Sequence, residues 1–213
     1  MKNRNKFLSV AFAFIVVFLS GCEKDDETAK VSFVTTYPIV NINGEQWNVL
    51  MVGEAFTDPG AEALEGETPI EVTTTGAVDV NTPGVYVLTY TAFNQEGFSA
   101  SATRYVGVIT PEAAAIDLSG QYKRNAGAEG VSTVTLIEPG LYQTDNIGGV
   151  AAPGPATTVR FFHYDVGQLG VPPQDVQGSL FSAVDGTVIP GVSYSWAVIN
   201  PGYGDVLRTF VKL

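Results

Sequence analysis

Hydrophobic and polar residues alternate along most of the chain after residue 30, with a period of two. This alternation is typical of β-strands that bury one face. Turn signals such as Asn43-Gly44 and Thr82-Pro83-Gly84 separate the runs. The expected strands of the first half cover residues 31–36, 39–42, 47–52, 70–75, 85–93 and 98–109. Because no helix intervenes, residues 31–110 are expected to form a β-sandwich.

The pattern breaks at residues 111–116, which are interpreted as a linker because Pro111 ends a strand and alanines follow. It resumes in residues 117–213, where turns are expected at Glu138-Pro139-Gly140 and Asn200-Pro201-Gly202. The expected strands cover residues 117–124, 131–137, 141–144, 157–164, 178–183, 187–189, 192–199 and 206–212. Eight short antiparallel strands predict a second β-sandwich or a small lipocalin-like barrel. The whole fold is therefore expected to be all-β.

The N-terminus has the anatomy of a secretory signal peptide. Basic residues precede the apolar run 7–19, which is too short to cross a bilayer core of ~30 Å as a helix. The run ends in Leu19-Ser20-Gly21-Cys22, which resembles the lipobox of bacterial lipoproteins. The resemblance implies removal of residues 1–21 and acylation of Cys22, which would anchor the protein in a membrane. The alternative is an ordinary secreted protein with one leftover cysteine.

An acidic tether, residues 22–30, follows the expected cleavage point. Lys24, Asp25 and Asp26 within it resemble the export signal of Bacteroidetes surface lipoproteins. This resemblance implies an outer-membrane lipoprotein that is exposed on the cell surface. The alternative interpretation is a solvated linker, the usual role of a charge run.

Charge and cysteine content exclude several classes of function. After loss of residues 1–21, the chain carries 8 basic and 22 acidic side chains, a net charge of −14. Such a surface repels phosphate backbones, so no nucleic-acid partner is expected. Cys22 is the only cysteine, and its lipidation would leave no thiol for a disulfide or a thiolate metal site. No cofactor is expected.

The first half also resembles a known family. The run 52–63, with Asp58-Pro59-Gly60 inside it, is similar to a signature of bacterial Ig-like surface modules, which are also known from a pesticidal crystal protein. Asp58-Pro59-Gly60 is suited to a tight corner. Tyr86 is expected to act as a tyrosine corner, with its hydroxyl bonded to nearby backbone. Asn94 and Phe98 depart from the family pattern, which argues against a bound cation in their hairpin.

The second half resembles the domain of unknown function that accompanies this module in Bacteroidetes surface lipoproteins. Two stretches carry this resemblance, residues 118–122 and 142–149. Its candidate ligand site combines aromatic and polar residues near one turn. We expect a sugar ring to stack on an aromatic platform while polar side chains accept its hydroxyl protons. The candidate residues are Tyr194, Trp196, Asn200, Tyr203 and Asp205. Alternatively, Tyr194 and Trp196 are core residues. The loop 146–155 is a second candidate rim.

Catalytic motifs are absent from the sequence. His163 is the only histidine and is expected to be structural, partly buried and hydrogen-bonded. No HExxH, GxSxG or EF-hand spacing occurs, so no catalytic or metal residue is assigned and no enzyme activity is expected. The leading hypothesis is a binding or scaffolding component of a glycan-uptake system, in contact with glycan or outer-membrane uptake proteins. The alternatives are a structural or adhesive surface protein and, more weakly, a glycoside hydrolase whose carboxylates meet in the fold.

Overall fold

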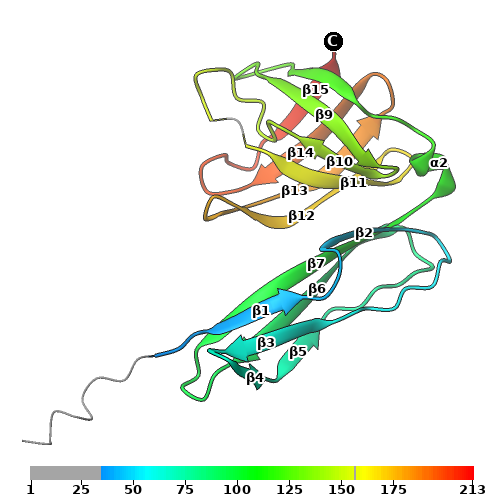
Figure 1. The fold of residues 1–213 in the computed structure, drawn as a ribbon. Coiled ribbons are helices and arrows are strands. Elements are labelled where there is room, and N and C mark those ends of the chain that lie inside the picture. The colour runs from blue at the N-terminus through cyan, green and yellow to red at the C-terminus, as the bar shows by residue number, and fades with distance from the viewer. Residues whose placement is uncertain (1–34, 156) are drawn as a thin grey trace, which may run out of the picture. The chain divides into compact units, whose positions relative to one another are not determined.

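The computed structural model describes residues 35–155 and 157–213. Residues 37–213 form one compact unit, whose regular structure is almost entirely β-strand (Figure 1). The all-β prediction is confirmed. The linker contains α2 (Pro111–Ala114), a single turn whose first residues are capped by the Thr110 hydroxyl. No helix in the described ranges is long and apolar enough to cross a membrane.

Several predictions concern residues outside the described ranges. They are the signal peptide at residues 1–21, the lipidated Cys22 with its tether, and the export signal at Lys24, Asp25 and Asp26. These remain predictions from the sequence.

Residues 38–109 form two sheets, the arrangement of a β-sandwich. The first sheet is antiparallel, with the order β1 (Pro38–Ile42), β3 (Ala61–Glu65), β4 (Thr68–Ile70). The second has the order β2 (Trp47–Met51), β7 (Ser99–Ile109), β6 (Gly84–Phe93), β5 (Val72–Thr75), in which β2 runs parallel to β7. Strand β6 buries one of its faces in the sandwich, since Leu88, Tyr90 and Ala92 are all buried.

The sandwich differs from the prediction at residues 61–75. Strand β3 was not predicted, and the single strand expected at 70–75 is divided between the two sheets. The division falls at Glu71, which separates β4 from β5. A chain that changes sheets at a corner keeps a strand-like local pattern on both sides, so alternation alone does not mark the break.

Residues 120–212 form a closed, antiparallel barrel of eight strands. Each strand pairs with its neighbours in sequence, and β8 pairs with β15 to close the barrel. The barrel order is β8 (Gly120–Arg124), β9 (Val131–Glu138), β10 (Leu141–Thr144), β11 (Val159–Asp165), β12 (Gln168–Val176), β13 (Ser179–Ile189), β14 (Ser193–Ile199) and β15 (Leu207–Lys212). Of the two folds left open by the sequence, the barrel is the one observed.

Two barrel strands differ from those expected. Strand β12 was missed because Pro172 and Pro173 lie within it, and proline lacks the N–H that a strand ladder uses. Its pairing with β13 slips by one residue between Val171 and Gln174, so a β-bulge accommodates the prolines. Strand β13 was predicted as two strands, but it continues through a second bulge at Asp185, whose φ is 56°.

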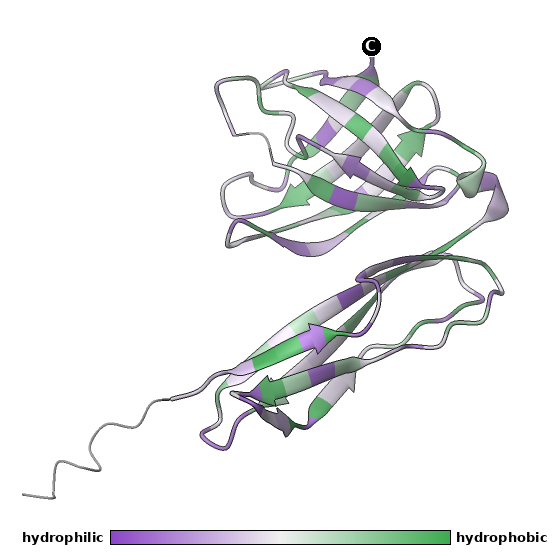
Figure 2. Ribbon diagram, in the orientation of Figure 1, coloured by the Kyte–Doolittle hydropathy of each residue, from purple (hydrophilic) through white to green (hydrophobic). Residues whose placement is uncertain are grey.

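Aromatic side chains fill the barrel interior. Tyr194 stacks on Phe210 with ring centroids 4.6 Å apart, and Phe161 meets Trp196 edge-on at 5.4 Å. Tyr142 stacks on Phe161 at 5.5 Å. Figure 2 shows hydrophobic and hydrophilic residues alternating along the strands, as the inward and outward positions of a barrel require.

The four-stranded sheet of the sandwich is also covered on its second face. Tyr105 from β7 packs in one buried cluster with Leu141 and Phe162 of the barrel. The backbones approach closely at two glycines: a Cβ at Gly107 would lie 2.3 Å from the Phe162 ring, and one at Gly170 would lie 2.4 Å from Val85. Sandwich and barrel therefore pack directly against each other within the compact unit.

Candidate functional site

The structure corrects the predicted aromatic platform. Tyr194 and Trp196 are 3% and 0% exposed and lie in the barrel core. The Tyr194 hydroxyl donates to Ser132 Oγ at 2.9 Å, and Trp196 Nε1 donates to the Ile147 carbonyl at 2.9 Å. Burial raises the pKa of Tyr194. Both polar groups are used within the protein, so neither ring is free to stack on a sugar, and the core alternative describes them.

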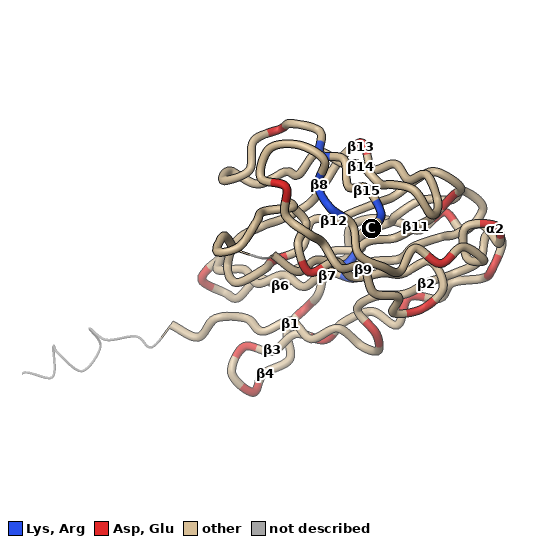
Figure 3. Tube along the Cα trace, turned by 90° about the horizontal axis from the view of Figure 1, so that it is seen from above, with Lys and Arg blue, Asp and Glu red and all other residues tan. Residues whose placement is uncertain are grey.

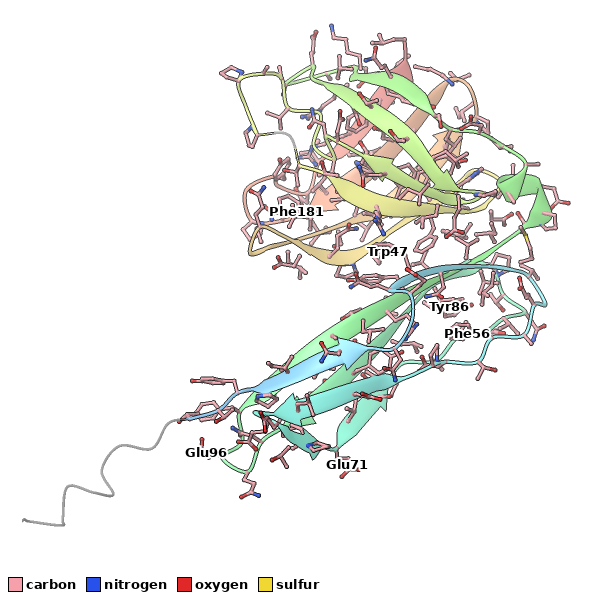
Figure 4. All side chains as sticks on the ribbon, in the orientation of Figure 1. Trp47, Phe56, Glu71, Tyr86, Glu96 and Phe181 are labelled. Carbon is pink, nitrogen blue, oxygen red and sulfur yellow. The ribbon has the colours of Figure 1, made fainter. Side chains whose placement is uncertain are left out.

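The other three predicted residues lie in the loop between β14 and β15. The Asn200 amide donates to Ser179 Oγ and the Leu180 carbonyl, both at 2.9 Å, so this side chain fixes the loop. Tyr203 is half-buried, with its ring edge-on to Phe181 at 5.5 Å (Phe181 is labelled in Figure 4). Asp205 is exposed. The fold does not bring these residues together with Tyr194 and Trp196 on one surface.

The second candidate rim, the loop 146–155, is fixed at its start. Asn146 is 4% exposed, and its amide donates to the carbonyls of Val131 and Val150 at 3.0 and 2.9 Å. Its Oδ1 accepts a hydrogen bond from Val150 N. These bonds give the buried part of the loop a structural role.

A cleft that the sequence did not reveal lies where the sandwich packs on the barrel. Its volume is about 810 Å³, within the range of small-ligand pockets. Strands β2, β6 and β7 form one wall, and the barrel from β10 to the start of β13 forms the other. Its polar and aromatic lining includes Gln46, Trp47, Thr103, Gln143, Thr158 and Arg160.

Arg160 is the principal charged donor of this cleft, and two contacts fix its position. Its backbone N–H donates to Gln174 Oε1, and its carbonyl accepts from Gln174 Nε2, both at 2.8 Å. Its guanidinium carbon lies 5.6 Å from the centroid of the Trp47 ring, a cation–π arrangement. Figure 4 shows Trp47 on β2 pointing toward the barrel strands.

Other polar groups flank Arg160 on the same wall. Gln143 on β10 is its register partner across the ladder, and Thr158 lies two residues earlier on the same face. On the opposite wall, Gln46 Nε2 donates to the Thr103 carbonyl at 3.0 Å. The cleft thus offers amides, hydroxyls and one guanidinium beside an aromatic edge, which is chemistry suited to a polyhydroxylated ligand.

The motif residues of the sandwich are structural, as expected. Tyr86 donates its hydroxyl to the Thr82 carbonyl at 2.8 Å, so the predicted tyrosine corner is confirmed. The Asp58 Oδ1 atom accepts from Gly60 N at 3.0 Å and from the Tyr90 hydroxyl at 2.6 Å. It also lies 3.3 Å from Nε of the buried Arg104. This carboxylate therefore ties the Asp58-Pro59-Gly60 corner to the sandwich core.

His163 is more buried than predicted. It is 0% exposed, and neither ring nitrogen has a hydrogen-bond partner within the described residues. Burial lowers its pKa, and the nearby Ala113 backbone and Asp165 charge oppose this effect only in part. In residues 35–155 and 157–213, no three His, Cys, Asp or Glu side chains cluster in a way that could hold a metal ion.

The sandwich also matches a known protein family. Residues 40–108 match the Ig-like domain of bacterial surface proteins. The match extends from β1 into β7, so the Ig-like domain corresponds to the sandwich. The expected resemblance to such modules is confirmed for this part of the chain.

One solved structure similar to this chain is the crystal structure of a lipoprotein from Bacteroides thetaiotaomicron. The two sequences are 26% identical, the similarity covers 83% of this chain and 100% of that chain, and the TM-score is 0.37. No curated protein matches the chain.

Sequence reasoning missed the cleft because its walls come from strands far apart in the chain. A signal for a covered second sheet face was nevertheless present. Val85 and Val87 alternate with Tyr86 and Leu88, so β6 begins with apolar residues on both of its faces. Such a strand is expected to be buried on both sides. That pattern marks where the Ig-like domain meets the barrel, but it names no ligand.

Proposed function

We propose that this protein is a non-catalytic surface lipoprotein that binds a glycan, as an accessory binding or scaffolding component of a glycan-uptake system. Two observations support the location. The Ig-like domain belongs to a family of bacterial surface modules, and Leu19–Cys22 resembles a lipobox. In this proposal, Cys22 anchors the chain in the outer membrane and Lys24, Asp25 and Asp26 direct it to the cell surface.

The cleft between the Ig-like domain and the barrel is the observation that carries the binding role. It is large enough for one or two sugar units, at about 810 Å³. Its lining combines Gln143, Thr158 and Arg160 on one wall with Gln46 and Thr103 on the other. Sugars present hydroxyls in several directions, so a site with hydrogen-bonding groups on two walls is suited to them.

A cleft-filling variant tests the binding role. Thr158 is exposed and lines the cleft, so Thr158→Trp should fill the cleft and reduce retardation of residues 23–213 in polysaccharide affinity gels. Thr187→Trp is the matched control, because Thr187 is an exposed threonine of β13 that does not line the cleft. Circular dichroism verifies that both variants fold. Equal retardation of both variants on every polysaccharide would contradict a glycan site in this cleft.

The proposed anchor is tested in intact cells. Cys22→Ser should release the protein from the membrane fraction, and mass spectrometry of the unchanged chain should find acyl groups on Cys22. Replacing Lys24, Asp25 and Asp26 by alanine should leave the protein lipidated but protected from added protease. An unmodified Cys22 in a protein found in the culture fluid would contradict the proposed location.

A second function, contact with another protein, is favoured by one surface of the barrel. The outward side chains of Leu180, Ile199 and Leu207, from β13, β14 and β15, are 60%, 45% and 55% exposed. Contiguous apolar surface of this kind often marks a protein interface. Leu207→Glu would disrupt such a contact and leave glycan binding unchanged, whereas Thr158→Trp would have the opposite effect.

A further inference from the structure

The arginines of the described chain differ in what satisfies their guanidinium groups. Arg104 pairs with Asp58, with Nε and Oδ1 3.3 Å apart. Arg124 donates to the Gly148 carbonyl, and Arg208 donates to the carbonyls of Val206 and Tyr203. Within residues 35–155 and 157–213, the Arg160 guanidinium has neither a hydrogen bond nor an ion pair.

The lack of a partner for the Arg160 guanidinium among the described residues is unexpected because hydrogen-bond acceptors are abundant in this chain. The chain has 22 acidic residues against 11 basic ones, and Figure 3 shows few basic residues among many acidic ones. Arg160 is half-buried and lines the cleft. Its backbone is fixed by Gln174 and its guanidinium lies near Trp47. The group is therefore held in place with its N–H donors unused.

We infer that Arg160 binds an anionic group of the glycan, a carboxylate of a uronic acid or a sulfate ester. This inference rests on the proposed glycan-binding function and specifies its ligand class. A guanidinium presents N–H donors in a planar fork that matches two oxygens of such a group, and the charge strengthens both hydrogen bonds. An adjacent aromatic ring favours this planar orientation.

The surroundings of Arg160 support an acceptor-rich ligand. Gln143, its register partner, has an amide with two N–H donors, and Thr158 adds a hydroxyl. Asp175 is the one acidic residue in the lining, and its Oδ1 accepts from Gly178 N at 3.0 Å, at the turn after β12. It forms no ion pair with Arg160 in the described structure. The anionic group is thus expected at the Arg160 guanidinium, whose N–H donors Asp175 does not occupy.

Pairs of polysaccharides that share a backbone but differ in charge test this inference. Polygalacturonate is compared with its fully methyl-esterified form, and dextran sulfate with dextran, by isothermal titration of residues 23–213. We expect binding to one charged member and at least tenfold weaker binding to its neutral partner. Arg160→Gln should weaken binding to the charged member about tenfold or more, and Arg160→Lys by less, because lysine keeps the charge but loses the fork.

Arg124→Gln is the matched control, since Arg124 lies outside this cleft and should leave affinity unchanged. Binding to polygalacturonate alone identifies a carboxylate, and binding to dextran sulfate alone identifies a sulfate. Equal affinity for charged and neutral members, or no effect of Arg160→Gln in a folded variant, overturns the inference but leaves glycan binding standing. Absence of binding to all four polymers and to a wider neutral panel overturns both the inference and the proposed function.

Discussion

In the Ig-like domain, the buried guanidinium of Arg104 uses each of its nitrogens. Nε donates to the Tyr90 hydroxyl at 2.8 Å, Nη1 to the Glu45 carbonyl at 2.7 Å, and Nη2 to the carbonyls of Asn43 and Gly60. In the barrel, Arg208 is 4% exposed, yet its Nε has no partner within the described residues. Burial and then the charge of Arg124 lower the pKa of Arg208.

This difference indicates two ways of building a core. The Ig-like domain joins both of its sheets through a polar network around Arg104, because the bonded carbonyls belong to turns that connect different strands. The barrel interior instead contains packed aromatic rings around Trp196. Removing one partner of the Arg104 network should therefore destabilise the Ig-like domain strongly. In the barrel, removing the volume of a buried aromatic side chain should have the strong effect.

The largest effect is expected for Trp196→Ala. Its ring is fully buried and contacts Phe161, Tyr194 and Phe210. Truncation removes these contacts and leaves the Ile147 carbonyl without its donor. The free energy of unfolding should fall by about 3–5 kcal/mol, as measured by urea denaturation. Phe93→Ala, at a 59% exposed aromatic, should change it by less than about 0.5 kcal/mol. Similar losses in both variants would contradict an aromatic core.

Arg104→Met should destabilise the Ig-like domain by about 3 kcal/mol. Methionine retains much of the apolar stem but leaves the Asp58 carboxylate and three backbone carbonyls without their charged donor. Arg124→Met is the matched control, with one carbonyl bond to lose and an expected cost of about 1 kcal/mol. Urea denaturation compares the two. A loss from Arg104→Met no larger than the control would show that the network does not hold the sandwich together.

Much of the Ig-like domain could be predicted from its sequence, because its features are local. Asp58-Pro59-Gly60 forms a turn that its own side chain closes, and Tyr86 bonds a carbonyl four residues away. For residues 117–213, the sequence was compatible with both a sandwich and a barrel. Alternation predicts the strands, but it does not show whether the first and last strands pair. That closure depends on Phe210 and Val211 meeting Arg124 and Lys123, a contact between distant residues.

The candidate site was less predictable for a related reason. An aromatic residue on an alternating strand fits a core and a binding platform equally well, and only the closed barrel decides that Tyr194 and Trp196 point inward. The cleft at Arg160 needs β2 and β11 side by side, although Trp47 and Arg160 are far apart in the chain. No local pattern carries that information.

Gly107→Ala tests the packing between the two regions. An added Cβ would lie 2.3 Å from the Phe162 ring, so ring and strand must separate, at an expected cost of about 1–3 kcal/mol. Proteolysis near α2 should also become faster as the contact loosens. Gly84→Ala is the control on the neighbouring strand, because its Cβ would meet only the Tyr86 ring at 3.6 Å, an ordinary contact. Unchanged stability of Gly107→Ala would contradict close packing at this point.

The smallest effect concerns pH and the buried His163 of β11. Since burial lowers the folded-state pKa of His163, the unfolded chain binds more protons between that value and a pH of about 6.5. Its contribution to stability is therefore complete above pH of about 6.5 and is lost as the pH falls toward the folded-state pKa. Urea midpoints between pH of about 7.5 and 5.5 should decline for the unchanged chain and decline less for His163→Leu. The same decline in both chains would assign the pH dependence to other titratable groups, and His163 would then be only a packing element of β11 beside α2.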